Sequence, residues 1–283
     1  MRTRRTTFLC SALALLVAAG AVAGCGKKSS KAATLDISVA ESGKTAKYTV
    51  PSSAKGGLVK VTLTDHGKAP HGGQLVRIEG DHTAQQAVKI ISGNNEKTPG
   101  WIRGEGGPGT AAPGQSADAT VKLPAGKYLV GDFNGEGGKP GYAQFTVTSG
   151  KSGKLPSTQT TVTAANPSKD HYKWQISGTL KPGTQNLTFD SKGKESIHLL
   201  AAFAVRGNPS KKVLIKALKS NGKPPAFVLG PPAVTSVLDG GKSEVTSFSL
   251  QKPGKYVLFC PLPDRDGGKP HFEEGLLTTV TVK

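Results

Sequence analysis

The sequence predicts an all-β protein made of two tandem Greek-key β-sandwich domains, each interrupted by one short helix. Two observations lead to this fold class. Apolar and polar residues alternate in short segments such as 35–39, 58–63 and 245–250, which is the pattern of half-buried strands. The second half of the chain also repeats the first. Because 283 residues are enough for two domains of ordinary size, we expect one domain written twice.

The chain begins with an expected export signal. Three arginines precede an apolar run over residues 8–22, which ends in small residues before Cys25. This pattern resembles the signals of bacterial lipoproteins. We therefore expect residues 1–24 to be removed and Cys25 to carry a lipid that anchors the protein to the extracytoplasmic face of the cell membrane. A plain secretory signal with a chance cysteine is the alternative, and the export route, general secretory or twin-arginine, stays open.

The segment after the signal and the charge of the chain both suit a surface location. Residues 25–33 are small, polar and basic, so we expect a lipidated, flexible tether. Removal of the signal takes away three arginines and no acid, which lowers the formal net charge from +18 to +15. Lysines spread singly along the chain suit the membrane surface and anionic envelope polymers. Nucleic acid is not expected as a partner, because aromatic residues are few and there is no dense basic helix.

An internal repeat sets the predicted domain boundaries. At an offset of 126 to 130 residues, matched positions share aromatic, apolar or histidine character: Tyr48 with Trp174, Leu63 with Phe189, and His71 with His198. The sequence Gly-Lys-Tyr likewise occurs at 126–128 and again at 254–256. We expect domains over 34–148 and 159–283, joined by a linker over 149–158 that begins Ser-Gly-Lys-Ser-Gly-Lys.

Each copy also contains one predicted helix. In the first copy, Thr83 is expected as the N-cap and Gly93 as the end. In the second copy, Ser210 and Gly222 occupy the matching places. Apolar residues between these limits fall on one helical face. Such a stripe predicts packing against the core rather than a ligand site.

The second copy resembles the cupredoxins, a family of copper proteins. The resemblance rests on the sequence Glu-Ser-Ile-His ending at His198, the sequence Pro-Gly-Lys-Tyr-Val-Leu-Phe-Cys ending at Cys260, and the segment from His271 to Leu276. In that family, Pro-Gly-x-Tyr leads into a strand that ends in a copper-binding cysteine, and a histidine and an axial methionine follow. The resemblance implies that His198, Cys260 and His271 are equatorial copper ligands, with Leu276 at the axial position without coordinating.

The residue types give this resemblance its chemistry. Two histidines and one cysteine with a weak or absent axial ligand form a site suited to electron transfer by copper. Met1 is the only methionine, so no thioether is left for the axial position once the signal is removed. A free Cys260 in an oxidising compartment also needs a role, which a bound metal would supply. Ten turn-forming residues separate Cys260 from His271, and they could close as an excursion that returns the histidine to the sulfur.

The first copy is expected to lack this copper site. Asp132 and Gly141 stand where the second copy has its cysteine and second histidine, so the first copy would serve as a spacer or docking surface. A different metal site in this copy is the less favoured reading, because histidines near loops are more often solvated than ligating. Its ligands would be drawn from His66, His71, His82 and Asp132.

Sequence motifs of conventional enzymes are weak, so we expect no enzyme. The glycine-rich residues 104–109 precede no helix and are expected to form turns. Cys260 and His271 could form a nucleophilic pair, but nothing marks an orienting residue or an oxyanion hole. The carboxylates around His271 are expected to solvate the loop, with calcium binding as a poor second: Asp264, Asp266, Glu273 and Glu274.

The expected function is that of an extracytoplasmic, membrane-anchored lipoprotein that binds copper. It would use the copper for electron transfer with a redox partner protein or for copper handling. The alternative is a metal-free lipoprotein that binds a surface partner through its sandwich loops, with Cys260 as a buried, inert thiol. The two hypotheses differ in whether the thiol and the imidazoles of His198 and His271 converge within coordination distance.

Overall fold

The computed structural model of the protein describes residues 31–43, 45–93, 97–133, 141–168, 171–194, 196–220 and 222–283. The predicted signal over residues 1–24 and the lipidation site Cys25 lie outside the described residues. Ala33, which the sequence analysis assigned to the tether, instead begins the first strand. Within the described ranges, no helix is both long and apolar enough to span a membrane.

The first half of the chain forms a β-sandwich. One of its layers contains strands β1 (Ala33–Ser42), β2 (Thr45–Thr49), β4 (Gly57–Asp65) and β7 (Ser116–Leu123), in the order β2-β1-β4-β7. The other layer contains β3 (Ser53–Lys55), β9 (Gly141–Thr148), β8 (Gly126–Asp132), β5 (Gln74–Ile78) and β6 (Ile102–Gly104) in that order. Alternate residues of the two layers, such as Leu35, Ile37 and Val39, fill the core between them.

The second half repeats this arrangement. Its first layer has the order β11 (His171–Ser177), β10 (Thr161–Ser168), β12 (Gly183–Ser191) and β17 (Ser243–Leu250). Its second layer contains β15 (Ala233–Val234), β14 (Ala201–Val205), β18 (Gly254–Phe259) and β19 (Leu277–Val282). A short pair, β13 (Ile197–His198) and β16 (Leu238–Asp239), lies beside them. In the first half, β1 pairs antiparallel with β2 and in parallel with β4. In the second half, β10 pairs antiparallel with β11 and in parallel with β12. The predicted all-β class and internal repeat are therefore confirmed.

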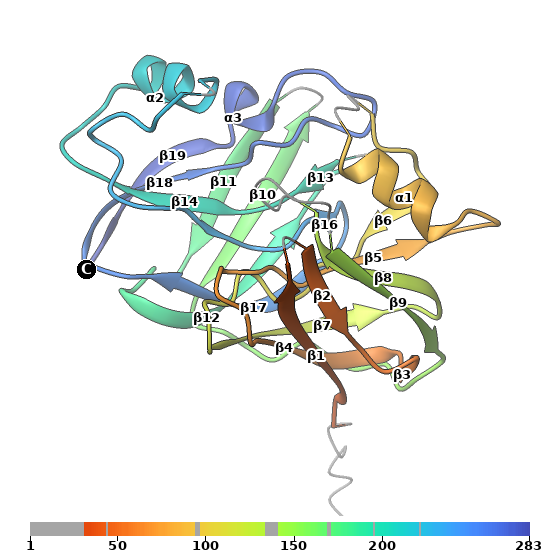
Figure 1. Ribbon diagram of the computed structural model, residues 1–283. Helices are drawn as coiled ribbons and strands as arrows, with labels where there is room; N and C mark the ends of the chain where they lie inside the picture. Colours follow the sequence, from red (N-terminus) through yellow and green to blue (C-terminus); the bar gives the residue numbers. More distant parts are fainter. Residues whose placement is uncertain are drawn as a thin grey trace, which may run out of the picture.

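Both predicted helices are present, and a third, short one was not predicted. Helix α1 (Ala84–Ile91) begins after Thr83, whose side chain caps it, and α2 (Lys211–Leu218) begins after Ser210. The third helix, α3 (His271–Glu274), has only four residues, too few to show a helical repeat of apolar residues. Figure 1 shows the three helices on one side of the molecule, away from the point where the chain enters β1.

The two halves share one continuous sheet. Strand β7 of the first half pairs antiparallel with β17 of the second, which joins the two four-stranded layers into eight strands (Figure 1). Residues 149–158 are the linker predicted between the copies. Its start lies along β4, because the N–H of Leu58 donates a hydrogen bond to the carbonyl of Lys151 over 3.0 Å. The two halves are therefore in extended contact.

Glu244 is a buried carboxyl at this contact. Its Oε2 accepts a hydrogen bond from the N–H of Gly107 in the first half over 2.8 Å, and its Oε1 has no hydrogen-bond partner in the described part of the chain. Burial raises the pKa of Glu244 from 4.5 to about 8. Between these two pH values the folded state binds more protons than the unfolded state. The free energy of unfolding should therefore fall as the pH rises through this range.

We expect Glu244→Gln to remove this pH dependence. The amide cannot ionise, so the variant should gain stability relative to the parent at about pH 8 and much less at about pH 5. Urea unfolding at the two pH values measures the difference. Asp36→Asn removes an exposed carboxylate from β1 and serves as the control. If the free energy of unfolding of the Glu244→Gln variant changed with pH as steeply as that of the parent protein, the raised pKa of Glu244 would be contradicted.

Candidate metal centre

Three side chains from separate elements converge in the second half. His198 ends β13, Cys260 directly follows β18, and His271 begins α3. The Nδ1 atoms of the two histidines lie 3.1 Å apart, and Sγ of Cys260 lies 3.6 Å from Nδ1 of His271. All three side chains are fully buried. Among the described residues, they are the one group of histidine, cysteine or acidic side chains whose possible metal-ligand atoms all lie within 4.8 Å of one another.

The ten residues between Cys260 and His271 fold back so that both ends meet. The N–H of His271 donates to the carbonyl of Leu262 over 2.9 Å, and the N–H of Phe272 donates to the carbonyl of Cys260 over 2.9 Å. At the far end of the loop, the N–H of Gly267 donates to the carbonyl of Asp264 in a tight turn. The length of the loop is therefore compatible with a common site for its two ends.

The outer hydrogen bonds of the histidines determine which ring nitrogen carries the proton. Nε2 of His198 lies 3.1 Å from the carbonyl oxygen of Lys192, and Nε2 of His271 lies 3.3 Å from Oδ1 of Asp264. Although burial opposes it, the hydrogen bond from Tyr172 holds the pKa of Asp264 below its usual value, so this carboxyl is ionised. A carbonyl and a carboxylate can only accept, and each Nε2 therefore carries the N–H.

The inner ring nitrogens are consequently left with lone pairs. Burial, followed by the neighbouring His271, lowers the pKa of His198 to about 3, and burial also lowers the pKa of His271. Both rings are thus neutral, and their Nδ1 lone pairs face each other with no proton to share. The thiol hydrogen of Cys260 can satisfy only one of them. A cation between the three atoms would satisfy both nitrogens and the sulfur together.

The surroundings of Cys260 fit a metal-bound thiolate. Burial raises the pKa of Cys260 to about 12, so the thiol without metal keeps its proton. The nearby backbone amides of Leu199 and Leu262 oppose this rise in pKa, which favours the negative charge. The same burial also argues against a nucleophilic pair of Cys260 and His271, which the sequence did not favour. A bound cation would take the place of the proton.

The spacing of the three atoms also fits a small metal ion. A metal with nitrogen and sulfur ligands at roughly 2.0 to 2.3 Å in a near-trigonal set places these ligands about 3 to 4 Å apart. The 3.1 and 3.6 Å separations lie within that range. Leu276, expected at the axial position, is fully buried in the same core cluster as Cys260, and its carbonyl accepts the N–H of Cys260 over 3.1 Å. A soft thiolate with two imidazoles is a donor set that suits copper.

Two further residues support the site: Tyr172, which the sequence does not mark, and Asp264, whose role differs from the one expected. The hydroxyl of Tyr172 donates to Oδ2 of Asp264 over 2.6 Å, and its ring centroid lies 4.3 Å from that of His271. Asp264 was expected only to solvate its loop, but it binds both Tyr172 and His271. Tyr172 lies 92 residues from Asp264 in sequence, and no local pattern marks such a contact.

The first half does not gather its histidines in the same way. His71 contacts Oε1 of Glu41 through Nε2 at 3.3 Å and lies 3.9 Å from Oδ2 of Asp132 through Nδ1. His82 instead stacks on Trp101, with ring centroids 3.9 Å apart, and His66 is exposed after β4. The less favoured set of His66, His71, His82 and Asp132 therefore does not form a group of converging ligand atoms in the described part of the chain.

Comparisons with known proteins give similar folds only. No protein-family model matches the chain, and no curated protein matches it. A multicopper oxidase structure is 15% identical, with 88% of each chain covered and a TM-score of 0.25. Auracyanin B is 25% identical over 46% of this chain and 91% of its own, with a TM-score of 0.30. A copper-containing nitrite reductase from Thermus scotoductus is 13% identical over 88% of this chain and 61% of its own, with a TM-score of 0.25.

These neighbours are proteins of the cupredoxin fold. Similarities of this strength identify neither a reaction nor a substrate. They do correct one expectation. Multicopper oxidases and the nitrite reductase are enzymes, so the prediction that this chain is not an enzyme is wrong as an exclusion.

Proposed function

We propose that the protein holds one copper ion between His198, Cys260 and His271 and uses it for electron transfer on the extracytoplasmic face of the membrane. The observation that carries this proposal is the meeting of two Nδ1 lone pairs and a thiol in a fully buried space. Copper, when bound, supplies a couple that changes by one electron. The protein residues hold the three ligand atoms in place in advance, which limits rearrangement when the charge changes.

Burial of the ligands favours electron transfer over copper handling. A protein that delivers copper must release it, which is easier from ligands that open to solvent. Here all three ligand side chains have no exposed surface, and hydrogen bonds fix both imidazoles from behind. This arrangement suits a resident ion. Electrons can cross the protein to a redox partner without exposure of the metal itself.

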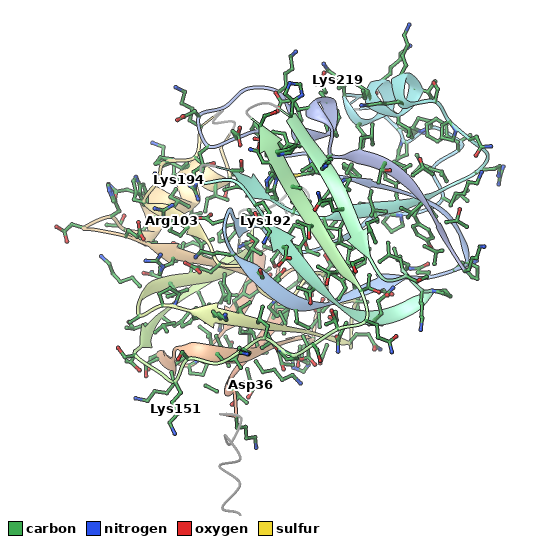
Figure 2. All side chains as sticks on the ribbon, turned by 180° about the vertical axis from the view of Figure 1, so that it is seen from behind. Asp36, Arg103, Lys151, Lys192, Lys194 and Lys219 are labelled. Atoms are coloured by element: carbon green, nitrogen blue, oxygen red, sulfur yellow. The ribbon has the colours of Figure 1, made fainter. Side chains whose placement is uncertain are left out.

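The proposed location rests on the sequence and the charge. Cys25 would carry the lipid anchor, and residues 26–32 would separate it from β1. Figure 2 shows Lys151, Lys194 and Lys219 at well-separated places on the surface rather than in one dense stripe. Such a diffuse positive charge supports contact with the anionic membrane surface, envelope polymers or an acidic redox partner protein.

Copper titration tests the proposal. A chain that begins at residue 31 is titrated with Cu(II) and followed by visible absorption. We expect an intense thiolate-to-copper band that saturates at one ion per chain, because the three ligand atoms form one site. Cys260→Ser should abolish the band. His66→Ala removes an exposed histidine outside the site and should leave the band unchanged.

The opposite result would support the alternative hypothesis. If no band forms and the Cys260 thiol stays unreactive until the protein is denatured, the site is not a copper centre. The chain would then be a metal-free binding lipoprotein.

A further inference from the structure

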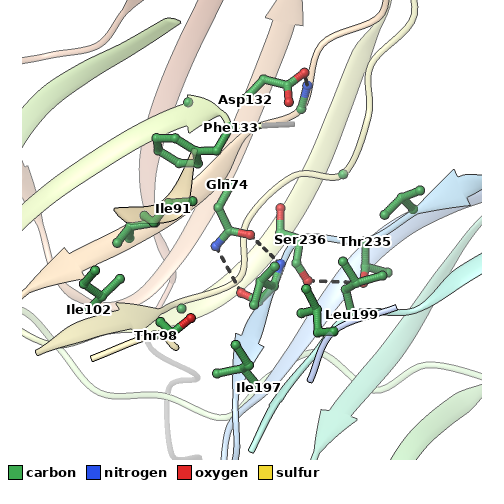
Figure 3. A pocket seen from close by; sticks show the side chains of 18 of the residues that line it. Gln74, Ile91, Thr98, Ile102, Asp132, Phe133, Ile197, Leu199, Thr235 and Ser236 are labelled. Carbon is green, nitrogen blue, oxygen red and sulfur yellow. Dashed lines mark hydrogen bonds between the residues drawn. The ribbon is translucent and has the colours of Figure 1, made fainter. Parts of the chain in front are cut away.

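A cavity of about 520 Å³ lies between the two halves, beside the metal centre (Figure 3). Ile91, Ile102 and Phe133 of the first half face it from one side, and Ile197 and Leu199 of the second half from the other. Its volume is within the range of sites that bind small molecules, about 300 to 1,000 Å³. Such sites are also concentrated where two domains meet.

Three neutral polar side chains of this cavity, those of Gln74, Thr235 and Ser236, are engaged with the protein itself. The Gln74 amide donates to the carbonyl of Val237 over 3.0 Å and accepts the N–H of Val237. The Ser236 hydroxyl donates to the carbonyl of Pro108 over 3.0 Å, and the Thr235 hydroxyl donates to the carbonyl of Ser236 over 3.2 Å. Hydrogen-bonding capacity is therefore largely used, and the walls offer mainly side-chain carbon to a ligand.

The charged groups at the cavity are engaged in the same way. Arg265 forms a buried ion pair with Asp239, and both side chains are almost fully buried. Asp132 accepts the N–H of Gly72 over 3.3 Å and faces His71. A charged ligand would have to compete with these partners for its counter-charge. An uncharged ligand needs no counter-charge, so it can enter without this competition.

The cavity also touches the residues that hold the metal ligands. Ile197 and Leu199 flank His198 in sequence, and Leu262 is two residues beyond Cys260. The carbonyl of Leu262 accepts the N–H of His271 over 2.9 Å. A molecule in the cavity would therefore pack against residues that adjoin His198 and hold the backbone of His271.

We propose that this cavity binds an uncharged, predominantly apolar organic molecule of one to three rings. Binding itself needs no metal, because the walls are formed by the protein alone. The effect of the ligand on copper rests on the proposed function. Leu199 and Leu262 would transmit its presence to the ligands, since a shift of Leu199 moves the backbone beside His198 and a shift of Leu262 changes its hydrogen bond with His271.

The test uses N-phenyl-1-naphthylamine, a neutral aromatic amine whose fluorescence rises in apolar surroundings. The metal-free chain from residue 31 is titrated with the probe, and we expect saturable binding at one site. Ile91→Trp and Val234→Phe fill the cavity from opposite walls and should each weaken binding at least about tenfold. Val213→Trp adds the same bulk as the first variant on the exposed face of α2 and should bind like the parent protein.

Two variants from opposite walls keep the test decisive if one of them fails to fold, which circular dichroism and thermal melting report. Absence of saturable binding, or equal binding by the parent and both filled variants, would overturn the proposal. The copper-loaded protein is then examined with the probe, which should shift the thiolate-to-copper band; an unshifted band would overturn the contact with the residues that hold His198 and His271. If the probe bound but no copper band formed, the result would support ligand binding in the cavity and would contradict only the proposed copper centre.

Discussion

Asp264→Asn is expected to weaken copper binding by about 10- to 100-fold, the usual cost of losing a residue that orients a metal-bound histidine. The carboxylate of Asp264 accepts the N–H of His271 and the hydroxyl of Tyr172. It therefore holds the His271 ring so that Nδ1 faces Cys260. The neutral amide no longer favours the proton on Nε2, and competition titrations with a chelator of known copper affinity would measure the loss.

The same substitution should also change the reduction potential. A carboxylate near the metal favours the more highly charged Cu(II) state, so its removal should raise the potential. Asp266→Asn is the matched control, because Asp266 is an exposed carboxylate two residues along the same loop. If both variants behaved alike, the change would reflect loop charge in general and the orienting role of Asp264 would be refuted.

Arg265→Met should destabilise the folded protein by about 3 to 5 kcal/mol, as expected when one partner of a buried ion pair is removed. The guanidinium pairs with Asp239 and donates to the carbonyls of Ile102 and Pro99 in the first half over 2.8 and 3.1 Å. Methionine keeps most of the side-chain volume but leaves Asp239 with a weaker partner, Arg103 at 3.4 Å. Urea denaturation of the metal-free protein measures the change in the free energy of unfolding.

Lys269→Met provides the comparison for this substitution. Lys269 lies in the same loop and is exposed, so its loss should change stability by less than about 0.5 kcal/mol. An Arg265→Met variant as stable as the Lys269→Met variant would show that the contact between the loop and the first half contributes little. Copper binding by Arg265→Met should also weaken, since the loop that carries both Cys260 and His271 loses its anchor.

Local patterns in the sequence predicted much of the fold and the three residues of the candidate metal centre. The helix caps at Thr83 and Ser210 lie next to the residues they cap, and the strand leading to Cys260 has a distinctive sequence. His198 and His271 were placed by resemblance to a family with the same order of ligands. In each case the informative residues are close together in the chain.

Contacts between distant segments could not be predicted in this way. Arg265 reaches Ile102 across 163 residues, and Tyr172 reaches Asp264 across 92. Arginine and aspartate are usually surface residues, so nothing in the sequence distinguishes Arg265 and Asp264 before the chain is folded. The length of the loop between Cys260 and His271 could not be explained from the sequence either. Its extra residues contact the first half of the protein, and this contact exists only when both halves are folded.

The junction of the two halves has the geometry of a symmetric dimer. Strands β7 and β17 occupy corresponding places in their layers, and Ala119, the fourth residue of one, lies opposite Thr246, the fourth residue of the other. Two identical chains would meet in this way about a two-fold axis, each with the same strand. The tandem chain thus corresponds to a homodimer made permanent by fusion, in which covalent linkage replaces affinity between subunits. The two copies nevertheless differ, because among the described residues only the second brings together a candidate metal-ligand set.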